Sequence, residues 1–315
     1  SYPKECKIQS RQRLKERNIF RFSFAMARFS LENDKIRIEI DSHGAELKSL
    51  VKKETGAEYM WCADPEYWGR TSPVLFPFVG NVSGKQYRTK GKTFDMGQHG
   101  FARDMEFTLE SQTDNEIWFV LRSNEETLAK YPYEFVLKLG YRLDGAKVEV
   151  LWHVENPSEE ELPFAIGGHP AFYCPVTSGG KQSDCYIQFD VAGSLKCSTI
   201  DGYLVGDRVD TYELEDGMLR IDEHLFDNDA LIIEKQNIKK VSLCDPKKQA
   251  FLTIELDAPL LGIWRPADPG APFVCIEPWY GRSDRIGYAG ELRDREYENV
   301  LAAGENWDAG YTILV

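Results

Sequence analysis

The sequence has no apolar run long enough to span a bilayer and no apolar segment typical of a secretory signal. It has no Cys-x-x-Cys pair, and its seven cysteines are an odd number scattered along the chain. Zinc ribbons and thioredoxin-type motifs are therefore not expected, and reduced thiols in a cytoplasmic protein are the simplest interpretation. A glycine-rich phosphate loop, a low-complexity linker and a short internal repeat are also lacking. We expect no membrane partner.

Positive charge is scarce: the chain has 38 Lys and Arg and 51 Asp and Glu, which gives a net charge of −13. Such a chain is a poor nucleic-acid binder, because phosphate contacts need clustered basic residues. Residues 1–25 differ, with seven basic and two acidic side chains, which leaves 31 basic and 49 acidic ones in the rest. We expect residues 1–25 to be a disordered or non-native extension, and residues 26–315 to form one domain. A targeting arm is the alternative for this extension, although it has few serines and no cleavage signature.

Helical signals are sparse, and two-residue alternation dominates instead. Residues 35–40 alternate polar and apolar, and residues 137–143 and 148–154 do the same on either side of Asp144-Gly145, which predicts a β-hairpin. Short helical pieces are expected only at 125–130 and 222–226. Further strands are predicted near 117–122, 185–189, 231–234, 240–244, 251–256, 261–264, 273–277 and 310–315. Many short strands with Gly and Pro punctuation predict an all-β fold, a large antiparallel β-sandwich.

Histidine is also scarce, and no pair of histidines has the local spacing of a typical metal site. We therefore predict no metal, with a site assembled from distant strands as the alternative. His43 lies in an expected turn, His153 on the polar side of an expected strand, and His224 in an acidic loop. We interpret these three as structural or surface residues. The remaining two histidines lie among glycines, prolines and aromatic residues.

His169 and Glu277 each precede a proline, which disfavours the helical region for the residue before it. His169 follows two glycines, which allow close approach of a ligand or another strand. Glu277 follows an apolar run, so we expect it at the end of a buried strand, with a raised pKa that suits a general base. A core histidine, and a carboxylate paired with Arg282 or Arg265, are the structural alternatives.

His99 and Arg103 lie four residues apart on one expected loop. A histidine and an arginine placed in this way suit the binding of sugar oxygens or of an anion. The aromatic content of 12% suits a site that stacks on the apolar faces of sugars.

Five segments together resemble the aldose 1-epimerase (galactose mutarotase-like) superfamily, over nearly the whole chain from about residue 29. The Gln-His-Gly-Phe-Ala-Arg motif is most similar to the divergent branch of LacX-like proteins and hexose-6-phosphate mutarotases. The segments are Asp41–Leu50, Pro73–Gly80, Gln98–Arg103, Gly167–Phe172 and Cys275–Trp279.

The resemblance implies the galactose mutarotase-like supersandwich and an isomerase that interconverts the α and β anomers of a hexose without a cofactor. By motif, Glu277 would take the proton of the C1 hydroxyl, His169 would protonate the ring oxygen, and His99 would hold sugar oxygens. A histidine that titrates near neutrality fits this acid role. The protein would be a monomer or homodimer, with a sugar or sugar phosphate as its partner.

Two departures from the family pattern concern the substrate. Many members have Arg where this chain has Asn81, and Arg70 or Lys85 is expected to compensate. The sugar-binding aspartate is Asp227 or Asp229, of which we favour Asp229. For a hexose 6-phosphate, Arg103 with Arg70 and Lys85 would supply the anion site.

Two other functions stay open at this point. One is a non-catalytic carbohydrate-binding or sugar-sensing protein on the same fold. The other is a hydrolase or lyase acting on oligosaccharides, although glycoside cleavage usually uses two carboxylates.

Overall fold

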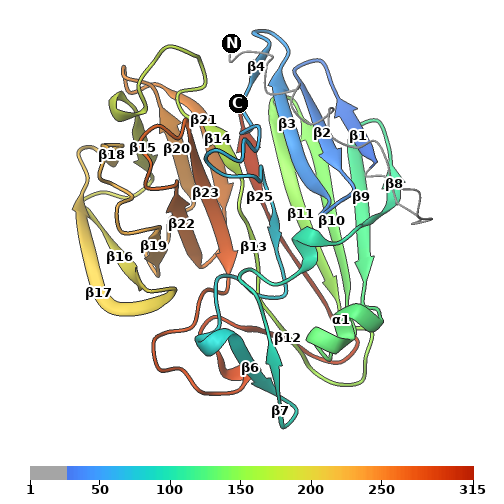
Figure 1. Ribbon diagram of the computed structural model, residues 1–315. Helices are drawn as coiled ribbons and strands as arrows, with labels where there is room; N and C mark the ends of the chain where they lie inside the picture. Colours follow the sequence, from blue (N-terminus) through green and yellow to red (C-terminus); the bar gives the residue numbers. More distant parts are fainter. Residues whose placement is uncertain (1–26) are drawn as a thin grey trace, which may run out of the picture.

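The computed structural model describes residues 27–315, so the expected extension 1–25 lies outside the described residues. Nearly all regular structure is β-strand, as predicted (Figure 1). The largest sheet has nine antiparallel strands in the order β18 (Met218–Arg220), β15 (Tyr186–Phe189), β20 (Lys240–Cys244), β21 (Ala250–Leu256), β25 (Asn306–Leu314), β11 (Lys147–Glu155), β10 (Val136–Asp144), β9 (Glu116–Arg122) and β8 (Thr108–Gln112).

A second large antiparallel sheet has eight strands. Its order is β17 (Leu204–Glu213), β16 (Ser194–Asp201), β19 (Leu231–Glu234), β22 (Leu260–Trp264), β23 (Phe273–Tyr280), β13 (Ile166–Gly168) and β5 (Val74–Leu75), with β14 (Ala171–Tyr173) also paired to β23.

Smaller elements complete the fold. A four-stranded sheet contains β1 (Arg28–Glu32), β2 (Ile36–Asp41), β3 (Glu46–Lys52) and β4 (Ala57–Glu58). Two-stranded pairs are β6 (Gln86–Thr89) with β7 (Lys92–Asp95), and β12 (Leu162–Phe164) with β24 (Asn299–Leu301). Helical pieces are α1 (Glu125–Lys130) and the 3₁₀ turns η2 (Ser83–Lys85), η3 (Ala102–Asp104), η4 (Gln182–Asp184) and η5 (Leu292–Asp294).

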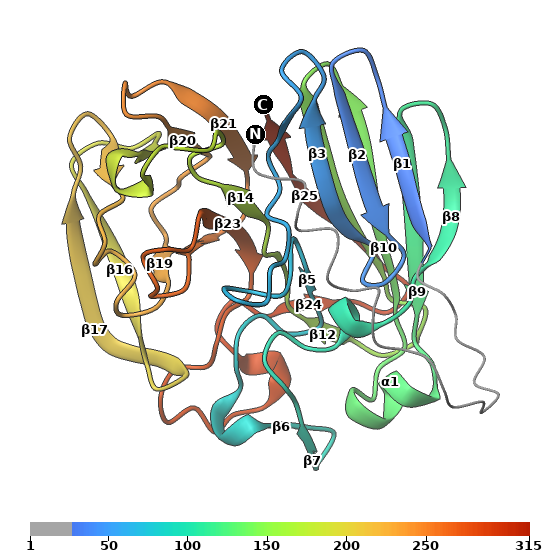
Figure 2. The same cartoon turned by 45° about the horizontal axis from the view of Figure 1, so that its top comes forward.

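The sheets pack face to face, and one buried apolar cluster contains residues from all three larger ones. Figures 1 and 2 show β1–β3 lying against β9 and β10, and the rings of Phe29 and Phe119 meet there at 5.2 Å. This sandwich of large antiparallel sheets confirms the predicted fold class.

The two-residue alternation decides which side chains enter the core. Strands β10 and β11 pair from Val136 opposite Glu155 to Asp144 opposite Lys147, so a two-residue turn joins them as predicted. The apolar side chains on the core face are buried, while Lys138, Arg142 and Glu149 on the opposite face form ion pairs. A strand has to send alternate side chains to opposite faces, and only one face here meets the core.

The predicted strand segments and the helix at 125–130 are confirmed, but the helical piece expected at 222–226 is wrong. These residues form successive turns. The carboxylate of Asp222 accepts the amide hydrogen of His224 (2.8 Å), and the carboxylate of Asp227 contacts the His224 ring (2.8 Å). Such local side-chain hydrogen bonds compete with helix formation. Among the described residues, no helix is long and apolar enough to cross a membrane.

Alternation along β23 also creates the site. Val274 and Ile276 face the main core, whereas Cys275, Glu277 and Trp279 point to the other face of the eight-stranded sheet. Loops cover that second face, so the chemistry-bearing side chains of β23 lie outside the main core and are still buried.

Candidate active site

Glu277 lies within strand β23 and not at its end, so that detail of the prediction is wrong. The strand continues through Pro278 to Tyr280. Pro278 lacks an amide hydrogen, which normally interrupts a central strand. Residues two apart in a strand direct their amides to the same side, and the amide of Ile276 reaches Pro170 at 3.3 Å. By the register of β13 with β23, Pro278 lies opposite Gly168, the last residue of β13, so the missing hydrogen falls where that ladder ends.

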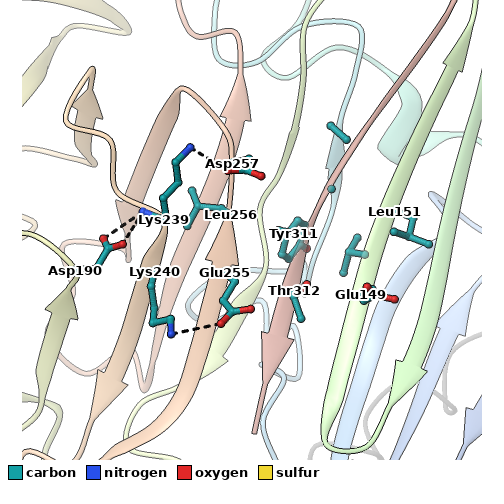
Figure 3. A pocket seen from close by; sticks show the side chains of 13 residues that line it. Glu149, Leu151, Asp190, Lys239, Lys240, Glu255, Leu256, Asp257, Tyr311 and Thr312 are labelled. Carbon is teal, nitrogen blue, oxygen red and sulfur yellow. Dashed lines mark hydrogen bonds and ion pairs between the residues drawn. The ribbon is translucent and has the colours of Figure 1, made fainter.

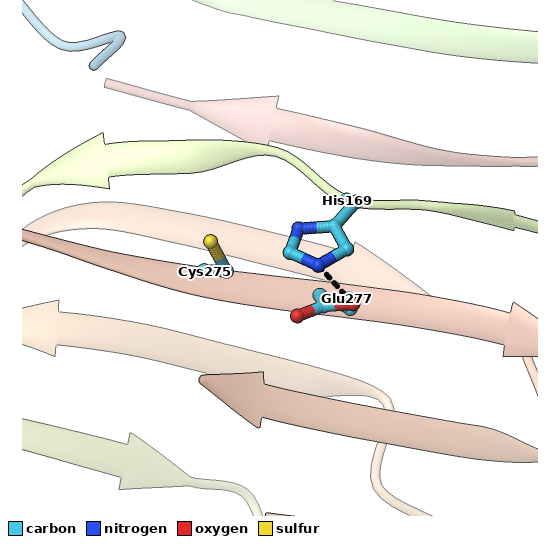
Figure 4. A group of neighbouring side chains, drawn as sticks. All are labelled: His169, Cys275 and Glu277. Atoms are coloured by element: carbon cyan, nitrogen blue, oxygen red, sulfur yellow. Dashed lines mark ion pairs between the residues drawn. The ribbon is translucent and has the colours of Figure 1, made fainter. Parts of the chain in front are cut away.

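His169 lies in the connection between β13 and β14. Its amide donates to the carbonyl of Pro73 (3.1 Å), and Pro170 follows before β14 begins. A Cβ on Gly167 would lie 2.7 Å from the Trp279 ring, so the glycine permits the close approach of β13 to β23. As a result, Nε2 of His169 lies 3.4 Å from Oε2 of Glu277 (Figure 4). The side chains are 9% and 1% exposed.

The environment separates the pKa values of this pair. Burial raises the pKa of Glu277 well above its usual range, and the negative charge of Asp229 adds to the shift. Burial, followed by the positive charge of Arg103, lowers the pKa of His169 to about 3. The expected histidine titration near neutrality is therefore wrong, because a buried imidazolium close to a guanidinium is disfavoured. The raised pKa of Glu277 agrees with the sequence-based expectation.

The alternative in which Glu277 pairs with Arg282 or Arg265 is also wrong. Arg282 forms ion pairs with Glu234 (2.9 Å) and Glu296. The guanidinium of Arg265 donates to backbone carbonyls, including that of Pro266 at 2.8 Å. The contacts to Glu277 come from His169 and from Trp279, whose Nε1–H donates to Oε2 at 3.2 Å.

Aromatic rings that the sequence did not single out enclose His169. Trp68 stacks on its imidazole at 4.6 Å between centroids and 28° between planes, and Trp264 meets it edge-on at 5.4 Å. These rings fix the imidazole plane and exclude water from it. No sequence motif marks Trp68 or Trp264; the high aromatic content was the only available signal.

His99 is held as a hydrogen-bond donor. The amide of Gly80 donates to Nδ1 of His99 at 2.9 Å, which leaves the ring proton on Nε2. Burial, followed by the charges of His169 and Arg103, lowers the pKa of His99 well below its ordinary value, so the ring is neutral. Its backbone has φ of +66°, and a Cβ on the next residue, Gly100, would lie 2.3 Å from the carbonyl oxygen of Phe76. The tight turn therefore requires glycine at that position.

One cavity of about 430 Å³ brings most of the predicted site residues together. Its size suits a small organic ligand. The predicted residues that line it are His169, Glu277, His99, Arg103, Asn81 and Asp229.

The structure distinguishes between the two candidate sugar-binding aspartates. Asp229 lines the cavity and has φ of +75°, whereas Asp227 lies on the surface against His224. It also distinguishes between Lys85 and Arg70, the two cations expected to compensate for Asn81. Lys85 lines the cavity, donates a short hydrogen bond to Oδ1 of Asn81, and lies 4.2 Å from the centre of the Tyr203 ring.

Arg70 is the one predicted binding residue that does not line this cavity. It pairs with Asp104 at 2.9 Å and borders a neighbouring hollow instead. Arg103 does line the cavity and donates to the carbonyl of Gln98 at 2.9 Å. Its Nε is buried without a hydrogen-bond partner among residues 27–315, and burial with the charge of Arg70 lowers the pKa of Arg103 to about 10.

The other three histidines lie apart from this cavity, in agreement with the sequence-based interpretation. His153 contacts Asp308 (2.6 Å), His43 lies 3.4 Å from Glu106, and His224 is exposed.

A larger hollow, about 500 Å³, lies over strands β20, β21, β25 and β11 (Figure 3). Its charged side chains are paired, as in Lys239 with Asp257 (3.0 Å) and Lys240 with Glu255 (3.4 Å). It holds no histidine, so it lacks the acid/base pair found beside β23.

Comparison with known proteins agrees with this fold. Protein LacX (chromosomal) of Lactococcus lactis subsp. lactis is 33% identical over 296 residues, covering 90% of this chain and 98% of LacX. The structure of a galactose mutarotase related enzyme from Lactobacillus acidophilus has a TM-score of 0.85 at 36% identity, covering 91% of this chain and 97% of that one. A galactose mutarotase-like protein from Lactobacillus casei ATCC 334 has a TM-score of 0.84 at 32% identity, covering 91% and 99%.

The aldose 1-epimerase family itself matches residues 27–313, which include all five segments that carry the sequence resemblance. A match of this length, together with the sandwich of antiparallel sheets and relatives above 30% identity, establishes that the chain belongs to the aldose 1-epimerase family.

Proposed function

We propose that this protein interconverts the α and β anomers of a hexose or hexose 6-phosphate by acid/base ring opening. The observation that carries the proposal is the buried pair of Glu277 and His169, 3.4 Å apart at the wall of a sugar-sized cavity. Binding alone needs no such pair of proton-transfer groups. The pair also has one carboxylate only, whereas glycoside hydrolysis usually needs two.

In the forward step, the carboxylate of Glu277 takes the proton from the C1 hydroxyl. The C1–O5 bond breaks as C1=O1 forms, and the ring oxygen takes a proton from Nε2 of protonated His169. Rotation about C1–C2 then exposes the other face of the aldehyde. Ring closure reverses both proton transfers and gives the opposite anomer.

The pair carries one proton throughout this cycle. In the empty cavity the pKa shifts place it on Glu277 and leave His169 neutral, which is the proton distribution of the ring-opened intermediate. The cyclic sugar requires the other distribution, with the proton on His169. The proton therefore has to pass from Glu277 to His169 before ring opening begins.

Other cavity residues would position the sugar. His99 offers its Nε2–H to a sugar oxygen, and Asp229 offers a carboxylate to hydroxyl groups. Lys85, held by Asn81 and Tyr203, supplies a cation that Arg70 does not, since Arg70 is engaged by Asp104. Trp68, Trp264 and Trp279 give the apolar walls on which sugar faces pack.

The test is NMR exchange or polarimetry on freshly dissolved α-D-glucose, α-D-galactose and glucose 6-phosphate. The proposal predicts acceleration of at least one of them over the spontaneous rate. Inhibition by inorganic phosphate would indicate a phosphorylated substrate, because Lys85 and Arg103 are the two cations that line the cavity. Sugar binding by saturation-transfer NMR without any acceleration would contradict catalysis and favour a sensing protein.

Replacement of Lys85 by methionine is expected to raise KM roughly 10- to 100-fold with a much smaller change in kcat. A hydrogen bond to a charged group contributes about 1.5–3 kcal/mol, and this ammonium lies with Asn81 on the cavity wall. Lys240→Met, on the nine-stranded sheet, is the matched control and should leave both constants unchanged. An unchanged KM in Lys85→Met would exclude Lys85 from substrate binding.

The pH dependence of kcat/KM should show no step near 6.5, the usual histidine pKa. The pair keeps its single proton until the pH falls toward about 3, where His169 takes a second one and the rate drops. On the alkaline side the rate should fall only above the raised pKa of Glu277. The measurement is a rate profile corrected for spontaneous mutarotation, in the presence of a chelator. An acid limb centred near 6.5 that persists in the His224→Asn variant would contradict this assignment.

A further inference from the structure

Three metal-binding side chains meet beside the cavity, and two of them, His169 and Glu277, line it. A ring nitrogen of His169, Sγ of Cys275 and a carboxylate oxygen of Glu277 all lie within 4.8 Å of one another (Figure 4). All three residues are buried, at 7%, 0% and 1% exposure. Buried groups of this kind are unlike the exposed acidic clusters that are common on protein surfaces.

The fold brings this cluster together for a simple reason. Cys275 and Glu277 are two residues apart on β23, so both point to the same face of the sheet. The register of β13 and β14 with β23 places His169, in the connection between them, beside Glu277 and on the same face of the sheet. No local sequence spacing shows such a cluster, which explains why the sequence predicted no metal.

The potential ligand atoms are not used up by other contacts. Nδ1 of His169 is buried without a hydrogen-bond partner among residues 27–315. Within the same range, the Cys275 thiol makes no hydrogen bond, since its strand neighbours present Ala171 and Trp264. Glu277 receives one hydrogen bond, from Trp279. A polar triad this poorly satisfied in a buried site is unusual.

We propose that His169, Cys275 and Glu277 form a binding site for a borderline or soft divalent cation, Zn²⁺ or Cd²⁺, and that its occupation blocks the acid/base pair. Imidazole, thiolate and carboxylate are all zinc ligands. Binding displaces the thiol proton of Cys275 and the carboxyl proton of Glu277 to solvent, and the two resulting anions balance the charge of the cation. Three protein ligands leave a fourth position open toward the cavity.

The surroundings also limit the affinity. The positive charge of Arg103, which acts on His169, repels a cation at this site. The ion therefore competes with protons and with sugar, and is not a permanent structural component. The binding part of the inference depends on the geometry alone, whereas the inhibition depends on the proposed function as well.

The binding test is titration of the metal-free protein with Co²⁺, which reports thiolate ligation by charge-transfer absorption in the near ultraviolet. We expect one equivalent to bind and Zn²⁺ to displace it. Cys275→Ser and Glu277→Gln should each lose the band, whereas Cys244→Ser, a buried cysteine on β20, should keep it. A band that survives in folded Cys275→Ser, or no band in the wild type, would overturn the site. If circular dichroism shows that Cys275→Ser does not fold, the Glu277→Gln variant decides the test instead. Survival of the absorption band in Glu277→Gln would then overturn the site.

The activity test uses the same variants. Zn²⁺ should inhibit wild-type mutarotation competitively with sugar, and Cys275→Ser should mutarotate normally without this inhibition. Zinc inhibition of equal strength in Cys275→Ser would contradict the ligand set. If the wild type does not accelerate mutarotation at all, the cobalt absorption still decides the binding site, so failure of the proposed function can be told from failure of the metal site.

Discussion

The Glu277→Gln variant is expected to lose roughly 10²–10⁴-fold in mutarotation rate while it binds sugar nearly as well as the wild type. Glutamine keeps the size of the side chain and an oxygen that can accept the Trp279 hydrogen bond. It cannot take the proton of the C1 hydroxyl. The loss should therefore appear in kcat, because proton transfer is needed in the transition state and not in the bound ground state.

The measurement is NMR exchange between anomers at saturating sugar, with affinity from saturation-transfer NMR. Glu255→Gln, on strand β21 of the other large sheet, is the matched control and should retain full activity. Retention of activity in Glu277→Gln would remove the general base from the proposed mechanism. Loss of affinity together with rate would instead assign Glu277 a binding role.

The His169→Asn variant is expected to be slowed by a similar factor, roughly 10²–10⁴-fold, because asparagine cannot protonate the ring oxygen. The aromatic enclosure by Trp68 and Trp264 should still shape the cavity, so sugar binding should persist. His153→Asn, on strand β11, is the matched control.

The double variant provides a sharper comparison. In the proposed mechanism Glu277 and His169 exchange protons with the same sugar in one concerted step, so the double variant should be slowed about as much as either single variant. If the two losses multiplied, the residues would act independently, and the shared-proton description of the pair would be wrong.

Much of the fold could be predicted from local sequence. Two-residue alternation located β2, β10, β11 and most later strands, because a half-buried strand must place apolar side chains on one face. The short helical piece expected at 222–226 was wrong, because the carboxylate of Asp222 accepts a nearby amide hydrogen and turns replace the helix.

The sequence by itself also determined which groups are available for chemistry. His169 and Glu277 each precede a proline, His99 precedes a required glycine, and all three lie in segments that resemble motifs of one family. It could not choose between Asp227 and Asp229, or between Lys85 and Arg70. Each choice depends on which loop turns toward the cavity, and that is set by long-range contacts such as Arg70 with Asp104 and Lys85 with the Tyr203 ring.

Only the tertiary structure decided the chemistry of the site. It set the 3.4 Å separation of His169 and Glu277, the opposite directions of their pKa shifts, and the approach of Cys275 to both. The physical reason is that a pKa depends on burial and on charges from residues distant in sequence, such as Arg103 and Asp229. Local sequence specifies strands and turns, whereas the distances between their side chains exist only once the sheets have packed.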